Sequence, residues 1–94
     1  MIRSFKSKET EKVWNGERSN KLPMEVQKVG RRKLRMLNNS IDINDLRVPP
    51  SNRLEKLSGN VTGFYSIRIN DQWRIIFKWS EGHSFDVQII DYHK

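Results

Sequence analysis

The sequence contains no cysteine and only two histidines, His83 and His93. The lack of cysteine excludes a disulfide framework, a thiolate nucleophile and a thiolate metal site. Two imidazoles are too few for a convincing zinc site. We therefore expect neither a metal nor a cofactor, and any chemistry has to come from carboxylate, phenol, imidazole and guanidinium groups.

Long apolar runs are also missing. No stretch approaches the roughly 20 apolar residues that a membrane-spanning helix needs. The first residues, MIRSFKSKE, lack the apolar core of a signal peptide. We therefore expect a cytoplasmic protein without a membrane partner.

Apolar residues make up 35% of the 94-residue chain, which is low for a globular protein. Three Trp, four Phe and two Tyr nevertheless supply large side chains for one modest core. We expect a single domain over residues 1–94. The net charge of +7 and the pI near 10.1 favour a polyanionic partner, either nucleic acid or an acidic protein.

Two helices are expected in the first half of the chain. Ser7 is a potential N-cap for a short helix that has Val13 and Trp14 as its buried end. A second helix should run from about Pro23 to Asn38, because a proline suits the first turn of a helix. Four residues give this second helix an apolar side: Val26, Val29, Leu34 and Leu37.

The second predicted helix also contains the densest basic run of the chain, over residues 28–35. Arg31, Arg32 and Arg35 are candidates for contact with RNA or an acidic partner, and a merely solvated helix face explains the run equally well. Gly30, in the middle of this helix, either weakens it or lets another element approach closely.

Shorter segments flank these helices. The alternation at residues 2–5 is long enough for one brief strand. Residues 41–46 predict one more helical turn, and Pro49-Pro50 then favours an extended path. A turn is predicted at Ser58-Gly59-Asn60, directly before the most strongly patterned part of the chain.

Residues 63–79, GFYSIRINDQWRIIFKW, predict a hairpin whose tip is residues 70–72. Pairing Ile67 with Ile75 makes one face wholly apolar, and the same register places Arg68 directly opposite Arg74 on the other face. Opposed like charges weaken a sheet. Either an anionic ligand such as phosphate lies between the two arginines, or they splay into water or pair with local carboxylates.

A last strand is expected after a turn at residues 81–83. Pairing Ile75 with Ile89 and Trp79 with Phe85 keeps the apolar face continuous, and it brings Lys78 opposite Asp86. Tyr92 then arrives diagonally beside Arg74.

The inferred order is a strand, two helices and a meander of about three strands. It predicts an α+β fold in which both helices cover the apolar face of an antiparallel sheet. The opposite face, with Arg68, Arg74 and Tyr92, is left open for a ligand.

These residue types suit the metal-independent cleavage of RNA. The reaction needs a base for the ribose 2′-hydroxyl, cations for the phosphorane-like charge and an acid for the leaving oxygen. Arg74, helped by Arg68, would hold the phosphate, with Arg53 and Lys56 as further phosphate-binding candidates. Tyr92 or Glu55 is the candidate base, His93 the candidate acid, and Asp91 would orient His93 or hold the chain end.

Each candidate also has a purely structural interpretation. Tyr92 fits a half-buried strand aromatic, and His93 fits a frayed terminal residue. Glu55 fits a surface partner for Lys56.

Four segments together resemble one known family: MIRSF at the start, RLEKLSGN, SIRINDQWRIIF and the terminal DYH. They are similar to the HigB branch of the RelE/ParE toxin superfamily over nearly the whole chain. The resemblance implies a RelE-like fold and a small basic toxin that cleaves mRNA in the ribosomal A site. It also implies a cognate HigA-like helix-turn-helix antitoxin, and we expect the free toxin to be monomeric.

The resemblance assigns residues where they match. Asp91, Tyr92 and His93 coincide with the terminal catalytic motif of HigB-like toxins, and Arg74 coincides with their phosphate-stabilising arginine. The loop before the hairpin departs from the histidine and lysine of HigB relatives, because this chain has Glu55 and Ser58 there. Two alternatives remain at this point, a ParE-like toxin that poisons DNA gyrase and a basic nucleic-acid-binding module without catalysis.

Overall fold

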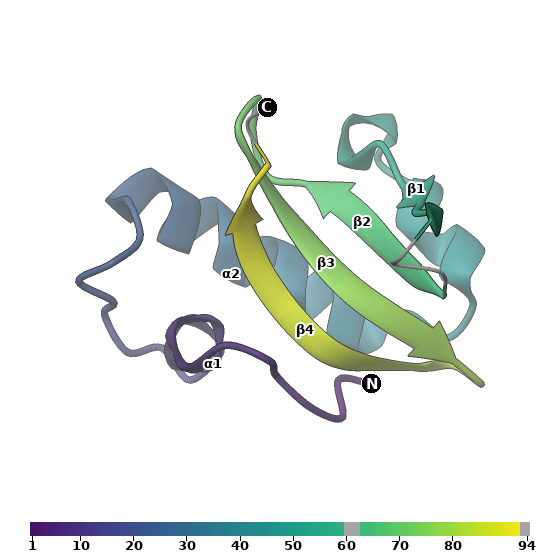
Figure 1. The fold of residues 1–94 in the computed structure, drawn as a ribbon, viewed down its shortest axis with the longest axis horizontal. Helices are drawn as coiled ribbons and strands as arrows, with labels where there is room; N and C mark the ends of the chain where they lie inside the picture. Colours follow the sequence, from purple (N-terminus) through teal and green to yellow (C-terminus); the bar gives the residue numbers. More distant parts are fainter. Residues whose placement is uncertain (60–62, 93–94) are drawn as a thin grey trace.

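The computed structural model describes residues 1–59 and 63–92. Two helices are packed against a four-stranded antiparallel sheet of order β1-β2-β3-β4, which confirms the predicted α+β fold (Figure 1). None of the described helices is long and apolar enough to cross a membrane. In chain order the elements are α1 (Lys8–Trp14), α2 (Met24–Asn39), the 3-10 turns η1 (Ile43–Arg47) and η2 (Pro50–Asn52), and the strands β1 (Glu55–Lys56), β2 (Phe64–Arg68), β3 (Trp73–Ser80) and β4 (His83–Asp91).

Both helices form as their sequences predict. The Ser7 hydroxyl accepts a hydrogen bond of 3.2 Å from the Thr10 N–H and caps α1. Helix α2 begins directly after Pro23, and its residues Val26, Leu34 and Leu37 are buried in the core. The helices thereby supply the layer that covers the apolar face of the sheet.

Gly30 lies where α2 closely approaches side chains of the sheet layer. A Cβ atom at this position would lie 3.2 Å from Cδ1 of Ile89 and 3.4 Å from Cδ1 of Ile69. The structure therefore supports the close-approach interpretation of this glycine.

The hairpin has the predicted register. Ile67 pairs with Ile75, and Arg68 pairs with Arg74. Its tip is fixed by Asn70, whose side-chain oxygen accepts hydrogen bonds from the N–H groups of Gln72 at 2.9 Å and Trp73 at 2.8 Å.

The second hairpin departs from its predicted register beyond Ile75 and Ile89, which pair as expected. A register shift places Lys78 opposite Phe85 and Trp79 opposite Ser84. The predicted pairings of Lys78 with Asp86 and of Trp79 with Phe85 are therefore both wrong. Asp86 lies at this bulge with φ +52°, and an inserted residue of this kind leaves the ladder locally unpaired.

Three local predictions are corrected. Residues 2–5 form two isolated parallel bridges, to Ser84 and Val87, instead of a strand. The extended path stops at Pro49, because Pro50 begins η2. The predicted loop at residues 55–56 is strand β1, which pairs with β2. Asn60, part of the predicted turn, lies outside the described residues.

Candidate active site

Two adjoining cavities lie on the sheet face opposite the helices. Tyr92 lines both of them, and we refer to the pair as the groove. The first, of about 330 Å³, is lined by Arg53, Arg68, Asn70, Asp71, Arg74 and Tyr92. The second, of about 370 Å³, is lined by Glu55, Lys56, Leu57, Ser58, Ile76 and Tyr92.

Arg74 is the best-connected side chain of the groove. Its Nη2 donates a hydrogen bond of 2.6 Å to the carbonyl oxygen of Arg53, and its Nη1 lies 3.0 Å from a carboxylate oxygen of Glu55. Its guanidinium carbon is 5.5 Å from the centre of the Tyr92 ring. These contacts unite a β3 residue with three residues from other parts of the chain.

The face around Arg74 is less open than predicted, because Arg74 is only 9% exposed. The cause is the chain before the hairpin, since residues 53 and 55 contact the guanidinium. Its Nε is buried and has no hydrogen-bond partner within residues 1–59 and 63–92. The contacts with the Arg53 carbonyl and the Glu55 carboxylate fix the orientation of this cation.

The opposed arginines are accommodated by local carboxylates, one of the two outcomes expected from the sequence. Arg68 pairs with Asp71, and Arg74 pairs with Glu55. The carboxylate partners are well exposed, with 97% of the Asp71 side chain and 55% of the Glu55 side chain open to solvent. Because each carboxylate stays largely in water, an incoming phosphate can replace it without exposing a buried group.

The chain end is tied to the tip of the first hairpin through Gln72. The Gln72 side-chain amide donates to a carboxylate oxygen of Asp91 at 2.9 Å, and the Tyr92 N–H donates to the Gln72 carbonyl oxygen at 2.6 Å. These bonds place the Tyr92 ring over Arg74, as the diagonal register predicts. Asp91 thus holds the chain end. His93, the predicted acid, lies outside the described residues.

A buried polar pair that the sequence did not predict, Lys33 and Asn52, lies next to the groove residue Arg53. Lys33 of α2 donates to the side-chain oxygen of Asn52, whose amide donates to the Leu46 carbonyl oxygen at 3.1 Å. Asn52 is fully buried and ends η2, and Arg53 follows in the left-handed conformation with φ +45°. The pair therefore fixes the turn that directs the Arg53 carbonyl toward Arg74.

Burial lowers the pKa of the Lys33 ammonium group, and the charges of Arg32 and Arg68 lower it further. A charged lysine in this position is costly unless it is hydrogen-bonded. In the sequence, the only indication of this buried lysine is its position on the apolar side of α2, next to Leu34.

The other predicted RNA-binding residues divide into two groups. Arg53, Lys56 and Arg68 line the groove. The exposed arginines of α2 do not line it: Arg31, Arg32 and Arg35. Over the described parts of the chain, no three His, Cys, Asp or Glu side chains gather as metal ligands.

The fold is shared with solved structures of bacterial proteins. The YoeB–YefM complex from Staphylococcus aureus aligns with a TM-score of 0.63 at 21% identity, covering 100% of this chain and 99% of that chain. A YafQ mutant from E. coli aligns with a TM-score of 0.66 at 14% identity, covering 97% and 91%. At such identities the likeness shows a shared RelE-like fold alone.

Sequence comparison gives the particular family. A model described as the RelE-like toxin of the type II toxin–antitoxin system HigB matches residues 3–93. Toxin HigB-1 from Vibrio cholerae is 38% identical over 95 residues, which cover 100% of this chain and 99% of that protein. An uncharacterized protein from Haemophilus influenzae is 47% identical over 64 residues, covering 68% and 63%.

This chain therefore belongs to the HigB-like family of RelE-like toxins, as the resemblance of its motifs predicts. It is the toxin of a type II toxin–antitoxin system, and an antitoxin is its partner.

Proposed function

We propose that this toxin is a ribosome-dependent mRNA endoribonuclease that acts in the cytoplasm and cleaves mRNA in the A site without a metal. The observation that carries the proposal is the fixed guanidinium of Arg74, which lines the groove between Glu55 and Tyr92. A preorganised cation next to an ionisable carboxylate is the arrangement that phosphodiester cleavage requires.

Arg74 stabilises the extra negative charge of the transition state. An mRNA phosphate replaces the Glu55 carboxylate at Nη1, while the bond from Nη2 to the Arg53 carbonyl keeps the guanidinium in place. Three further cations line the groove and attract the RNA backbone: Arg53, Lys56 and Arg68.

Glu55 acts as the general base, and Tyr92 is the second candidate for this role. A carboxylate is ionised near neutral pH, whereas a phenol keeps its proton. Displaced from Arg74, the Glu55 carboxylate takes the proton of the ribose 2′-hydroxyl, and the 2′-oxygen attacks phosphorus. The bond to the 5′-oxygen breaks, that oxygen receives a proton from His93, and a 2′,3′-cyclic phosphate remains.

The ribosome supplies the alignment that the groove does not. The base, the cation and the acid are an ordinary carboxylate, guanidinium and imidazole. The groove itself is open on the surface of the sheet. Correct alignment of the reacting atoms can contribute roughly 7–11 kcal/mol to a reaction of this kind. We therefore expect slow cleavage of free RNA. The antitoxin proposed for this toxin is a helix-turn-helix protein.

The test compares one synthetic mRNA, free and bound to assembled ribosomes, and identifies the ends of the products. The expected ends are a 2′,3′-cyclic phosphate or 3′-phosphate and a 5′-hydroxyl, with much faster cleavage on ribosomes. A 5′-phosphate with a 3′-hydroxyl would show metal-assisted attack by water and disprove the mechanism. Equal rates on free and bound mRNA would disprove the dependence on the ribosome.

A further inference from the structure

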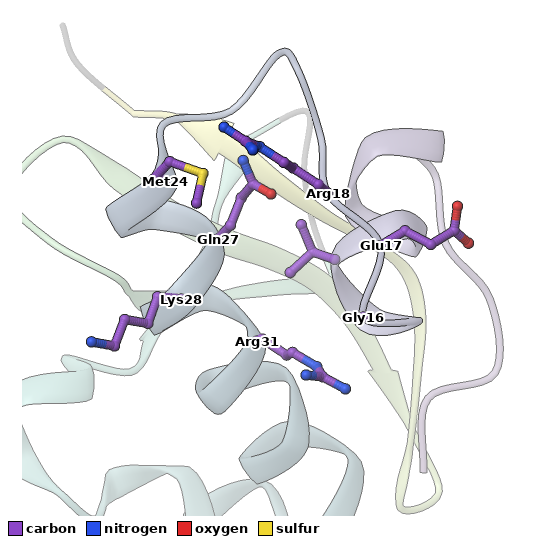
Figure 2. Close-up of a pocket in the computed structure, with 8 residues that line it drawn as sticks. Gly16, Glu17, Arg18, Met24, Gln27, Lys28 and Arg31 are labelled. Carbon is purple, nitrogen blue, oxygen red and sulfur yellow. The ribbon is translucent and has the colours of Figure 1, made fainter.

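A second hollow lies in the helical layer, between the end of α1 and the first half of α2 (Figure 2). Its volume is about 360 Å³, and we call it the α1–α2 pocket. None of its residues lines the groove. They are Val13, Gly16, Glu17, Arg18, Met24, Gln27, Lys28 and Arg31.

The turn after α1 builds one wall of this pocket. Helix α1 ends in a Schellman arrangement, in which the Gly16 N–H donates to the Val13 carbonyl and the Glu17 N–H donates to the Lys12 carbonyl. Gly16 has φ +81°, and a Cβ atom there would lie 3.1 Å from Nη2 of Arg31. Glycine therefore permits both the turn and the close approach of Arg31.

Gln27 holds the following loop against α2. Its side-chain oxygen accepts from the Ser19 N–H at 2.9 Å, and its amide donates to the carbonyl oxygens of Ser19 at 2.9 Å and Leu22 at 2.6 Å. Ser19 is 2% exposed and donates to Glu9 of α1 at 2.5 Å. The hollow is therefore set by hydrogen bonds to both helices.

The pocket combines an apolar floor with a cationic rim. Val13 is buried, while the Met24 side chain is 59% exposed and is one of four large apolar residues described as exposed. Arg18 and Arg31 flank the hollow, and the carboxylate of Glu17 points away from it (Figure 2). Among the described residues, neither arginine has an ion-pair partner, in contrast to Arg68 and Arg74.

This chemistry selects an acidic polypeptide that carries an apolar side chain. Carboxylates would pair with Arg18 and Arg31, and the apolar side chain would cover Met24 and Val13. An RNA strand would satisfy only the cations, because the pocket has no aromatic residue on which a base could stack. The net charge of +7 favours an acidic partner in either case.

We propose that the α1–α2 pocket is a docking site for an acidic segment of the cognate antitoxin that inserts one apolar side chain beside Met24. This inference rests on the family assignment and does not depend on the nuclease mechanism. The helices cover the face of the sheet opposite the groove, so a segment bound here leaves the groove uncovered.

The test measures the affinity of the purified cognate antitoxin for the toxin in the absence of ribosomes and RNA. Arg18→Glu reverses a rim charge, and Lys8→Glu makes the same change at an exposed position of α1 outside the pocket. Met24→Ser removes the apolar contact of the pocket. Its control is Ile41→Ser, the same kind of apolar-to-polar change at a residue that is 82% exposed and lies outside the pocket. We expect each pocket variant to weaken binding roughly tenfold, and each control to change it less than about twofold.

Further measurements test where the antitoxin binds and whether the variants stay folded. Amide hydrogen exchange on the wild-type complex should slow at residues 16–18 and 24–31 when antitoxin binds. Thermal unfolding of Arg18→Glu and Met24→Ser should match the wild type, which shows that they fold, and their ribosomal mRNA cleavage should also be unchanged. Unchanged antitoxin affinity in both variants, or no protection at these residues, would overturn the proposal. Lost cleavage with unchanged affinity would assign the pocket to RNA or the ribosome instead.

Discussion

The groove and the α1–α2 pocket both present arginines, but they hold them differently. In the groove, Arg74 is 9% exposed and contacts Glu55, Tyr92 and a backbone carbonyl. In the pocket, Arg18 is exposed and has no ion pair within the described parts of the chain. A fixed cation suits a developing charge at one position, whereas an exposed cation without an ion pair suits a partner that brings its own carboxylates.

The two regions also differ in how far apart their residues lie along the chain. All residues of the pocket lie between Val13 and Arg31, in two consecutive helices and the loop that joins them. The groove draws on the residue after η2, on β1 and the turn after it, on the first hairpin, and on the residue after β4, from Arg53 to Tyr92. Changes in the groove should therefore affect cleavage without affecting the antitoxin contact, and measuring both for each groove variant tests that separation.

The largest effect is expected for Arg74→Ala. Ribosomal cleavage should fall on the order of 10²–10³-fold, because the substitution removes a preorganised transition-state donor. Arg74→Lys should restore only part of the rate, since a point charge cannot make the bidentate fork of a guanidinium. Single-turnover cleavage and antitoxin affinity are measured on the same preparations, with Arg47→Ala as the control at an exposed arginine outside the groove.

Thermal unfolding accompanies the Arg74 experiment, because this side chain is buried. Loss of its bond to the Arg53 carbonyl should cost about 1–3 kcal/mol of unfolding free energy. A folded Arg74→Ala protein that cleaves as fast as the wild type would refute the assigned role. Weakened antitoxin binding by this variant would show that the groove and the α1–α2 pocket do not act independently.

Glu55→Gln should reduce cleavage by about 10²-fold, the lower end of the contribution of general-base catalysis. Tyr92→Phe should reduce it less, because the ring keeps its contact with Arg74 and only the hydroxyl is lost. Both rates are measured under single-turnover conditions on programmed ribosomes. A larger loss for Tyr92→Phe than for Glu55→Gln would transfer the role of base to the phenol.

Lys33→Met should reduce cleavage by about tenfold, less than the roughly 10²-fold that a misplaced catalytic group can cost. The substitution frees Asn52 and loosens the turn that directs the Arg53 carbonyl to Arg74. Lys6→Met serves as the control at an exposed lysine. The reduction should appear in the rate at saturating ribosome concentration, whereas a loss only of ribosome affinity would argue against a positioning role.

The smallest predicted effect is a pH dependence that comes from Lys33. Its folded pKa is lowered from the ordinary value of 10.5, chiefly by burial. Between the two pKa values the unfolded chain binds a proton that the folded chain has released, so the unfolding free energy should rise with pH there. Denaturant unfolding of wild type and Lys33→Met at several alkaline pH values below 10.5 should show this rise only in the wild type.

Local pattern was sufficient to predict much of the fold. The Ser7 cap, the extent of α2 and the pairing of Arg68 with Arg74 all follow from residues close together in the sequence. The pairing of Lys78 with Asp86 was predicted wrongly because the bulge at Asp86 leaves no mark in an alternating pattern. Strand β1 was missed because two residues are too few to show a periodicity.

The sequence by itself determined the α+β class, the hairpin register and the face on which Arg74 lies, because side chains alternate along a strand and the tip fixes the pairing. Only the tertiary structure decided that Arg74 is buried and which partners orient it. The position of Tyr92 follows from the strand register, but Arg53 and Glu55 are 19 or more residues from Arg74 along the chain, as Asn52 is from Lys33. Contacts over such separations depend on how whole elements pack, which no local pattern encodes.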